Sequence, residues 1–164
     1  MKEENGEALL LCDMIIDSQN FAISSNDYAE SAIRAFLNEV FYETAFNELS
    51  GQIILSTTLE NTEDKVFLLS VAEATAAEYG FSTDGTVIDD ARRKKTTDYA
   101  QSQGAYTINS GLAAYRGDGW WWLRSPSASG AGSACGITTG KINDQMEVDY
   151  TCFGVVPAVW IRLN

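Results

Sequence analysis

Three consecutive tryptophans, Trp120–Trp122, constrain the fold of this chain more than any other stretch. Each indole buries on the order of 200 Å² when it packs, so three in a row are unsuited to water. Because successive side chains of a strand point to opposite faces, Trp120 and Trp122 share one face and Trp121 takes the other. Both faces need cover, which predicts a strand at the centre of the domain. Arg124, on the face of Trp120 and Trp122, can stack on a ring or pair with a buried oxygen.

Composition and charge indicate one compact domain that does not bind nucleic acid. With 164 residues and 45% hydrophobic content, the chain is long enough to bury a substantial core. Its net charge of −12 leaves no excess of cations to neutralise phosphates. The one basic cluster, residues 92–95 (Arg-Arg-Lys-Lys), follows Asp89 and Asp90 and is interpreted as a solvated loop.

The residues available for chemistry argue against an enzyme and against a metal centre. The chain has no histidine, which is the commonest general base and metal ligand. Its three cysteines, Cys12, Cys135 and Cys152, lack CxxC spacing, so a zinc site is not expected. An odd number excludes a complete disulfide framework but leaves room for one bridge. We therefore expect no catalytic residue, no cofactor and no bound metal.

The chain shows neither a membrane span nor a signal peptide. No stretch approaches the roughly 20 apolar residues that a span requires. The N-terminus lacks the basic-then-apolar pattern of a signal peptide, since Lys2 is followed by Glu3, Glu4 and Glu7. Membrane insertion is not expected, and the sequence is compatible with the cytoplasm, a virion, or a surface reached after removal of a leader.

The hydrophobic pattern of residues 1–104 predicts the helical half of an α+β domain that spans 1–164. Apolar residues at helical spacing predict a long amphipathic helix over 28–46, begun near Ser24–Asn26. Short apolar runs at 8–16 and 65–70 predict buried strands, and the run at 53–55 predicts a strand or an extended connector. Gly51 is expected to end a short helical turn. Two further helices are expected at 71–79, between Ser70 and Gly80, and at 98–103, between Thr96 or Thr97 and Gly104.

The remaining half, 105–164, is predicted to consist of strands and loops. Small residues fill 127–135, which is expected to be an irregular loop entering a strand at 134–137. Residues 138–141 (Thr-Thr-Gly-Lys) are typical of a hairpin turn. Ile142 and Val148 are isolated apolar anchors in the polar stretch that follows. The near-continuous apolar run 153–161 predicts a buried closing strand, with Pro157 at a bulge or an unpaired edge position.

Five motifs follow one another along nearly the whole chain. They are SAIRAFLN followed by FY and AF in 31–46, DKVFLLS followed by Glu73, TDYA at 97–100, WWLRSP at 121–126, and GVVPAVWI at 154–161. In this order they resemble a bacterial domain family of uncharacterised function that is common in gut bacteria and their phages. The closing motifs are similar to those of C-type-lectin-like domains, in the branch that includes formylglycine-generating enzymes and the variable proteins of diversity-generating retroelements. The chain departs from the family at Val156, where arginine is usual.

The resemblance implies a C-type-lectin-like fold of class α+β. Such a fold has small antiparallel sheets, a long helix in the N-terminal half and paired terminal strands, which agrees with the apolar runs at 8–16 and 154–163. Loops and sheet surface near the C-terminus vary there without disturbing the core, as is usual for recognition sites.

We therefore expect a non-catalytic module that binds an unknown protein or surface ligand through residues 127–153. Large apolar residues frame this stretch on both sides, while most of its own positions are small or polar. It is rich in the residues that adenine-directed mutagenesis produces, so diversification by a retroelement is one form of the hypothesis. Tyr150 and Phe153 are the favoured anchors, although Phe153 suits a core position equally well. The expected contact residues are Ser129, Cys135, Thr138, Lys141, Asn143, Gln145, Glu147, Asp149, Tyr150 and Phe153.

Three alternatives stand beside this hypothesis. The chain suits a structural module of a cell-surface or virion protein. An enzyme of the formylglycine-generating type needs a cysteine pair at defined spacing, which Cys135 and Cys152 only approximate. Calcium-dependent sugar binding has oxygen ligands in Asp144, Glu147 and Asp149, but the Glu-Pro-Asn and Trp-Asn-Asp motifs of sugar-binding lectins are not in the sequence.

Overall fold

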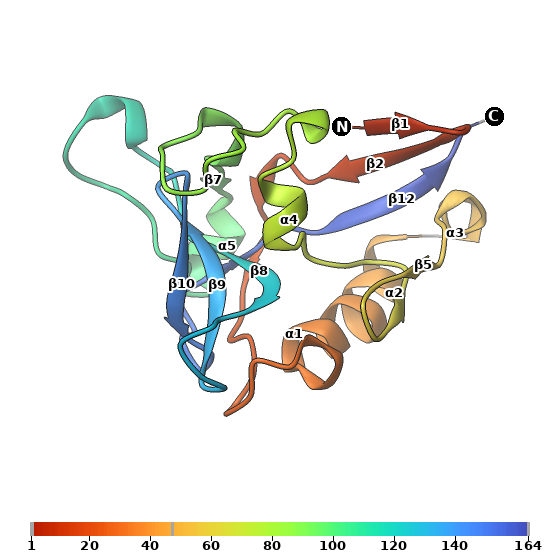
Figure 1. The fold of residues 1–164 in the computed structure, drawn as a ribbon, viewed down its shortest axis with the longest axis horizontal. Helices are drawn as coiled ribbons and strands as arrows, with labels where there is room; N and C mark the ends of the chain where they lie inside the picture. Colours follow the sequence, from red (N-terminus) through yellow and green to blue (C-terminus); the bar gives the residue numbers. More distant parts are fainter. Residues whose placement is uncertain (1, 47, 164) are drawn as a thin grey trace.

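The computed structural model of the protein describes residues 2–46 and 48–163, which form a mixed α+β arrangement around two main sheets (Figure 1). The five-stranded sheet has the order β10-β9-β8-β11-β4 and the three-stranded sheet the order β1-β2-β12. The β9–β10 hairpin lies at one side of the molecule, and the three-stranded sheet extends to the other (Figure 1). The strands of these sheets are β1 (Lys2–Glu4), β2 (Glu7–Leu11), β4 (Asp17–Ser18), β8 (Trp121–Pro126), β9 (Ser133–Thr138), β10 (Lys141–Glu147), β11 (Gly154–Val155) and β12 (Ala158–Arg162).

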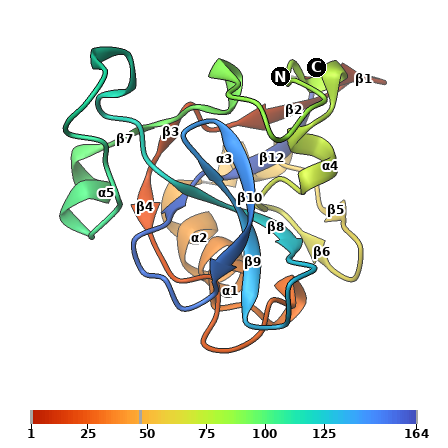
Figure 2. The same ribbon diagram turned by 60° about the vertical axis from the view of Figure 1, so that its left-hand side comes forward.

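Short elements connect and cover these sheets. Two-stranded pairs are formed by β3 with β7 and by β5 with β6. Seen from the hairpin side, β9 and β10 cross in front of the helices α1 and α2 (Figure 2). No helix among the described residues is long and apolar enough to cross a membrane. The bounds are β3 (Met14–Ile15), β5 (Thr57–Thr58), β6 (Glu63–Asp64), β7 (Lys95–Thr96), α1 (Ala32–Ala35), α2 (Tyr42–Ala45), α3 (Glu48–Ile53), α4 (Val71–Ala74), α5 (Asp98–Ser102), and the 3₁₀ turns η1 (Tyr28–Glu30), η3 (Ala77–Tyr79), η4 (Asp90–Arg92) and η5 (Ala113–Tyr115).

The tryptophan run takes the central position that its composition predicts. Strand β8 is the middle strand of the five-stranded sheet, and Trp121 and Trp122 are both fully buried. Trp120 and Trp122 both contact the ring of Phe153, with centroids 5.5 and 4.4 Å away, so they share one face. Trp121 is buried on the opposite side, where its indole Nε1 donates to the carbonyl of Arg92 at 3.0 Å.

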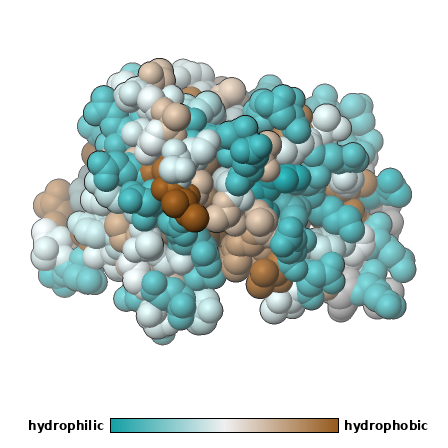
Figure 3. Space-filling model, turned by 90° about the horizontal axis from the view of Figure 1, so that it is seen from below, coloured by the Kyte–Doolittle hydropathy of each residue, from teal (hydrophilic) through white to brown (hydrophobic). Residues whose placement is uncertain are grey.

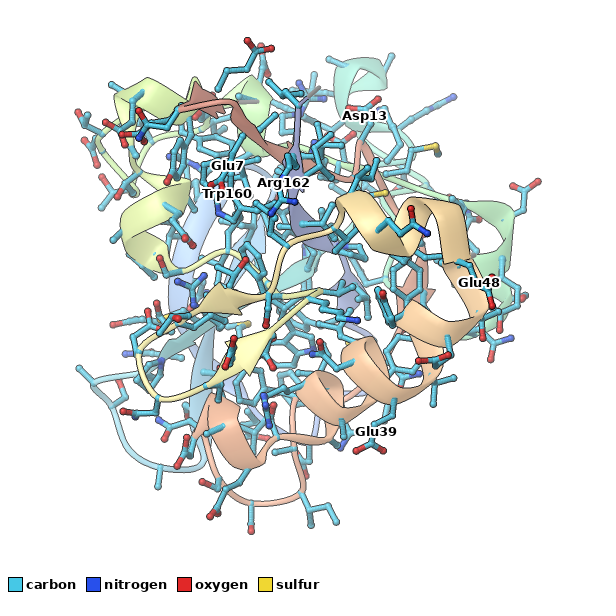
Figure 4. The ribbon with its side chains drawn as sticks, turned by 90° about the vertical axis from the view of Figure 1, so that its right-hand side faces the viewer. Glu7, Asp13, Glu39, Glu48, Trp160 and Arg162 are labelled. Carbon is cyan, nitrogen blue, oxygen red and sulfur yellow. The ribbon has the colours of Figure 1, made fainter. Side chains whose placement is uncertain are left out.

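The two ends of the chain pair as neighbouring strands, as expected. Strands β2 and β12 are antiparallel, with Leu9 opposite Trp160 and Glu7 opposite Arg162. Figure 4 shows Glu7, Trp160 and Arg162 close together on these strands. The prediction of one strand over 8–16 is wrong, however, because the strand is interrupted at Cys12 and Asp13. Beyond the break, β3 pairs with β7 and β4 joins the other sheet.

The long amphipathic helix is shorter than predicted and contains a π-helical segment. Residues 28–30 form the 3₁₀ turn η1, and Ser31 then takes an extended conformation and caps α1 by accepting from Arg34 N. The helix continues through the π-helical segment η2 (Phe36–Phe41) into α2, and Phe46 is extended. The caps expected at Ser24–Asn26 are therefore wrong. A hydroxyl next to the helical run competes better for free N–H groups than one several residues upstream.

Two distant motifs are held together by polar contacts of this helix. The guanidinium of Arg34 pairs with the carboxylate of Asp64, which is 2% exposed, through Nε and Nη2, each 2.8 Å from Oδ1. The side chain of Asn38 accepts from Lys65 N at 3.0 Å and donates to Val66 O at 2.9 Å. Charge-assisted and paired hydrogen bonds of this kind fix the approach of two segments as well as stabilising it.

The strand predicted at 65–70 is instead an extended crossing segment. Residues 66–70 are buried, but only Phe67 forms a bridge, with Ala158. Arg124 fixes the rest: its backbone N–H donates to Leu69 O, and its guanidinium binds Leu68 O, Glu60 and Glu73. The expectation that Arg124 pairs with buried oxygens is confirmed.

The structure confirms the predicted caps of the two later helices, but both helices are shorter than predicted. Ser70 and Glu73 form a capping box at α4, but the helix breaks at Thr75 before η3, which Gly80 ends in the left-handed conformation. Thr97 caps α5 as expected. Gly51 lies inside α3 rather than at the end of a helix, and Ile54 makes a single bridge to Ile161.

The hairpin turn at 138–141 is confirmed, and the strand after it is longer than the sequence indicated. Thr139 and Gly140 both have positive φ angles, 56° and 79°, which is the geometry of a tight two-residue turn. Residues 141–147 form β10, although only Ile142 and Met146 offer it apolar side chains. The closing run divides at Pro157 into β11 and β12, and the Pro157 carbonyl accepts from Cys12 N at 2.9 Å.

Candidate functional site

The expected binding stretch, 127–153, forms the edge of the five-stranded sheet and the loops at its ends. Strand β10 is the outermost strand and pairs with β9, with Ile142 opposite Ile137 and Asn143 opposite Gly136. A register shift between Asn143 and Met146 bulges the strand. Edge strands that carry a bulge and charged side chains present side chains without inviting a further strand to pair.

The structure divides the ten expected contact residues into three groups. Alternation along the hairpin and its loops places most of them toward solvent. The buried members offer little side-chain surface to a large ligand. Ser129, Lys141, Gln145, Glu147, Asp149 and Tyr150 are exposed, Thr138 and Asn143 are half-buried, and Cys135 and Phe153 are buried.

Phe153 is a core residue on which the hairpin rests. Its ring stacks on Trp122 and lies under Gly136, where a Cβ atom would come within 2.7 Å of the phenyl ring. Only glycine permits this approach of strand to ring. Tyr150, 39% exposed, stacks on the outer side of the same ring with centroids 6.4 Å apart. Tyr150 is thus the solvent-facing end of an aromatic stack that begins in the core.

A second exposed aromatic ring continues this stack. Tyr106 lies on Trp120 with ring centroids 4.0 Å apart, and Tyr106 is 40% exposed. The indole Nε1 of Trp120 is buried and has no hydrogen-bond partner among the described residues. The sequence pattern gives no sign that Tyr106 belongs to this surface, because it precedes the tryptophan run by more than ten residues and only the fold brings them together.

Cys135 is held in a form that does not react readily. Its thiol donates to Pro126 O at 3.5 Å, and burial, with the nearby negative charge of Asp144, raises its pKa to about 11. All three cysteines, Cys12, Cys135 and Cys152, are free thiols. The thiolate is the reactive form, so at pH 8 only about one Cys135 side chain in a thousand is reactive.

We therefore expect Cys135 to resist alkylation in the native protein. At pH 8, its labelling by iodoacetamide should be slower than that of the half-buried Cys152, and urea should abolish the difference. Mass spectrometry of the labelled peptides measures both rates in one sample. Equal rates for Cys135 and Cys152 in the native protein would contradict the buried, neutral thiol.

The tip of the hairpin is anchored by Arg92, which corrects the interpretation of residues 92–95 as a solvated loop. The Arg92 side chain is fully buried, and its Nε donates to Gly140 O at 2.9 Å. Gly140 approaches so closely that a Cβ atom there would lie 2.6 Å from Asp89 O. The other members of the cluster are also engaged: Lys94 is buried, and Arg93 and Lys95 pair with the carboxylate of Asp118.

An apolar hollow lies away from the hairpin. It has a volume of about 630 Å³ and lies between the helical residues Phe36, Val40 and Phe41 and the strand residues Leu11 and Val159. Seen from below, apolar colour gathers near the middle of one face between hydrophilic flanks (Figure 3). Val40, in the helical wall of this hollow, is 54% exposed.

Two smaller hollows flank the WWLRSP strand. One, about 370 Å³, is lined by polar residues that include Glu60 and Arg124, whose charges already pair with each other. The other, about 540 Å³, has Cys135, Ile142 and Asp144 among its walls. Asp144, Glu147 and Asp149 do not converge: the described residues contain no group of three or more acidic, cysteine or histidine side chains that could hold a metal ion.

Comparison with known protein families gives a match. A family model described as "Domain of unknown function (DUF6273)" matches residues 5–163, which is nearly the whole chain. No curated protein and no solved structure matches.

Proposed function

Because the chain belongs to the DUF6273 family, whose description assigns no activity, we propose a function from its own geometry. The protein is a non-catalytic module that binds a protein or surface ligand through the exposed side of residues 127–153. The proposal is supported by the different positions of the motif side chains and of the hairpin side chains. Side chains of the sequence motifs hold the scaffold together, whereas most polar side chains of the hairpin face solvent.

The polar residues of the sequence motifs form ion pairs, hydrogen bonds and helix caps within the fold. Arg34 pairs with Asp64, and Asn38 bonds the backbone of the segment that follows it. Ser70 caps α4, and Arg124 joins that cap to the tryptophan strand through Glu73. Residues that are committed to such contacts cannot vary without loss of stability, so they leave little freedom for recognition.

The hairpin has the opposite character on its outer side. Lys141, Gln145, Glu147 and Asp149 are exposed, and Tyr150 adds a partly exposed ring. Lys141, Gln145 and Glu147 stand on β10, and Asp149 and Tyr150 lie just beyond its end. The partner strand β9 is fixed by the close approach of Gly136 to Phe153 and by the anchored tip. Binding residues held on a rigid frame lose little entropy when a ligand is bound, and exposed aromatic rings dominate interface energies.

The finer form of the proposal is that the domain is C-type-lectin-like and that the stretch is diversified by a retroelement. Paired terminal strands, small antiparallel sheets and a strand-rich C-terminal half support the fold relation. Val156, where the family usually has arginine, is fully buried among apolar residues. A valine at that position needs no buried partner, so the departure from the motif is compatible with the same scaffold.

Sequencing of the source locus across a population tests the proposal. We expect adenine-linked variation at the codons of Lys141, Asn143, Gln145, Glu147 and Tyr150, beside a near-identical template repeat and a reverse transcriptase gene. The structure adds an internal control within the same stretch. Codons of the buried residues Gly136, Phe153 and Gly154 should not vary.

Two outcomes would count against the proposal. Variation spread equally over buried and exposed codons would contradict recognition by the outer side of the hairpin. Invariant codons with no template repeat would remove diversification, and alanine variants of Tyr150 and Asn143 would then decide between a fixed binding surface and a structural module of a larger assembly. Unchanged affinity of both variants for an identified partner would favour the structural module.

A further inference from the structure

The apolar hollow beside the helix carries an inference that is independent of the hairpin. We propose that it is a second ligand site, which takes a small molecule with an apolar body and a single protonated amine. The hollow is on a different part of the molecule from 127–153, and none of its lining residues belongs to that stretch. Failure of either proposal leaves the other intact.

The walls of the hollow suit an apolar body. Phe36, Val40 and Phe41 come from the helix, and Leu11 and Val159 come from the paired terminal strands. The volume of about 630 Å³ lies within the range of roughly 300–1,000 Å³ that is usual for small-molecule sites. A hollow of this size suits a compact ligand rather than a protein surface, which is recognised over a much larger and flatter area.

The single charge in the lining selects the amine. Asp17 is the only charged residue among the described residues that line the hollow, and it is 8% exposed. Its carboxylate accepts a hydrogen bond from Ser18 N at 2.7 Å, and no ion pair joins it to a described cationic side chain. Buried carboxylates are normally paired, because removing a charge from water costs several kcal/mol unless a partner replaces the solvent. A ligand ammonium in the hollow would supply Asp17 with a partner of opposite charge, beside the hydrogen bond from Ser18 N.

The helix that forms one wall is locally distorted at the hollow. The π-helical segment η2 spans Phe36–Phe41 and supplies Phe36, Val40 and Phe41 to the lining. Segments of π-helix are rare and occur frequently at functional sites, since the extra residue per turn costs stability in a simple scaffold. Here the distorted segment supplies the apolar wall of the hollow and also buries Leu37 in the core.

The charge of the whole protein favours the same kind of ligand. A net charge of −12 raises the local concentration of cations at the surface. Figure 4 shows the carboxylates of Asp13, Glu39 and Glu48 projecting outward from separate elements. These exposed groups attract cations without selectivity. Experiments must therefore distinguish the effect of Asp17 on amine binding from the effect of the exposed carboxylates.

Three probes of similar shape and different charge test the site: phenylbutylamine, phenylbutanol and phenylbutyrate. We expect calorimetric titration of the intact protein to give a dissociation constant for the amine at least ~10-fold lower than for the alcohol, with the carboxylate weakest. Amide chemical shifts should move in 36–46 and 157–159 and not in the hairpin.

Two pairs of variants locate the interaction. Asp17→Asn should remove the preference for the amine over the alcohol, while Glu39→Gln, which removes the same charge from the exposed surface of η2, should preserve it. Val40→Lys should weaken both amine and alcohol several-fold. Val87→Lys makes the same change at a position that is 42% exposed and outside the lining, and should leave both affinities unchanged.

Several results would overturn the inference. Equal affinity for the amine and the carboxylate would remove the role of charge, and shifts confined to the hairpin would place the ligand elsewhere. An amine preference that survives Asp17→Asn would assign it to the general negative surface. If Asp17→Asn does not fold, equal effects of Val40→Lys and Val87→Lys on the amine affinity would still refute the site.

Discussion

Replacing Arg92 with methionine is expected to lower the free energy of unfolding by about 3–5 kcal/mol. The buried guanidinium donates to five backbone carbonyls, and methionine fills similar space without a donor. Removing the donors deprives these carbonyls of a partner, at a cost of about 1–3 kcal/mol for each one that stays buried and unpaired. The acceptors are Gly140 O, Ser82 O, Asp84 O and Val87 O at 2.9 Å, and Ala74 O at 3.2 Å.

Urea unfolding followed by tryptophan fluorescence measures this effect. Arg116→Met is the matched control, because Arg116 is exposed, and it should change stability by less than ~0.5 kcal/mol. Arg92→Lys should recover only part of the loss, since an ammonium cannot match the planar fork of five donors. Equal stability of Arg92→Met and Arg116→Met would show that the loops around the guanidinium are held by other contacts.

The same variant has a local consequence for the hairpin. The carbonyl of Gly140 accepts from both the Arg92 side chain and Asp89 N, at 2.9 and 3.2 Å. Without the guanidinium, the Gly140 carbonyl loses one of these two hydrogen bonds. Hydrogen exchange of the Asp89 amide should then accelerate more than that of Trp121 in the centre of the sheet.

Replacing Phe153 with alanine is expected to cost about 3–5 kcal/mol, the usual range for a fully buried phenylalanine. The ring fills the space between Trp122 and Gly136, and its removal leaves a cavity that the rigid strand cannot close. Tyr150→Ala removes a ring from the same stack at a position that is 39% exposed. We expect that change to cost less than ~1 kcal/mol.

The pair separates the two roles that the residue pattern leaves open for Phe153. If Phe153 is a core residue, the loss of stability is large and Tyr150→Ala is nearly neutral, as measured by thermal or urea unfolding. Similar small effects of both substitutions would instead indicate that the two rings lie on the surface. If the expected result is obtained, Tyr150 is the residue to alter in tests of binding, because its ring can be removed without unfolding the domain.

Much of the scaffold follows from local pattern. The tryptophan run specifies a central strand, because covering both of its faces leaves no other position for it. Apolar runs near the two ends specify paired terminal strands, and Gly140 indicates the hairpin turn because glycine permits the positive φ angle that such a turn requires. Capping at Ser70, Gly80 and Thr97 is likewise readable, since each requires only a side chain or a φ angle beside a short helical run.

Other features follow no local rule. Residues 65–70 have the composition of a buried strand, but only Phe67 finds a bridging partner, on an edge of β12 that Ile54 also bridges. Strand β10 has few apolar residues and forms because β9 offers it a partner. Local pattern gives burial and propensity, while pairing depends on which edges remain free after the whole chain has folded.

The candidate sites divide in the same way. The order of residues is enough to identify 127–153 as a small and polar stretch framed by large apolar residues, since hydrophobic patterning is a local property of the chain. Folding of the whole chain is needed to place Phe153 beneath the hairpin, Arg92 at its tip, and Asp17 in an apolar hollow with a π-helical wall. Each of these depends on residues far apart in the chain, because the environment of a side chain is set by what packs against it rather than by its neighbours in sequence.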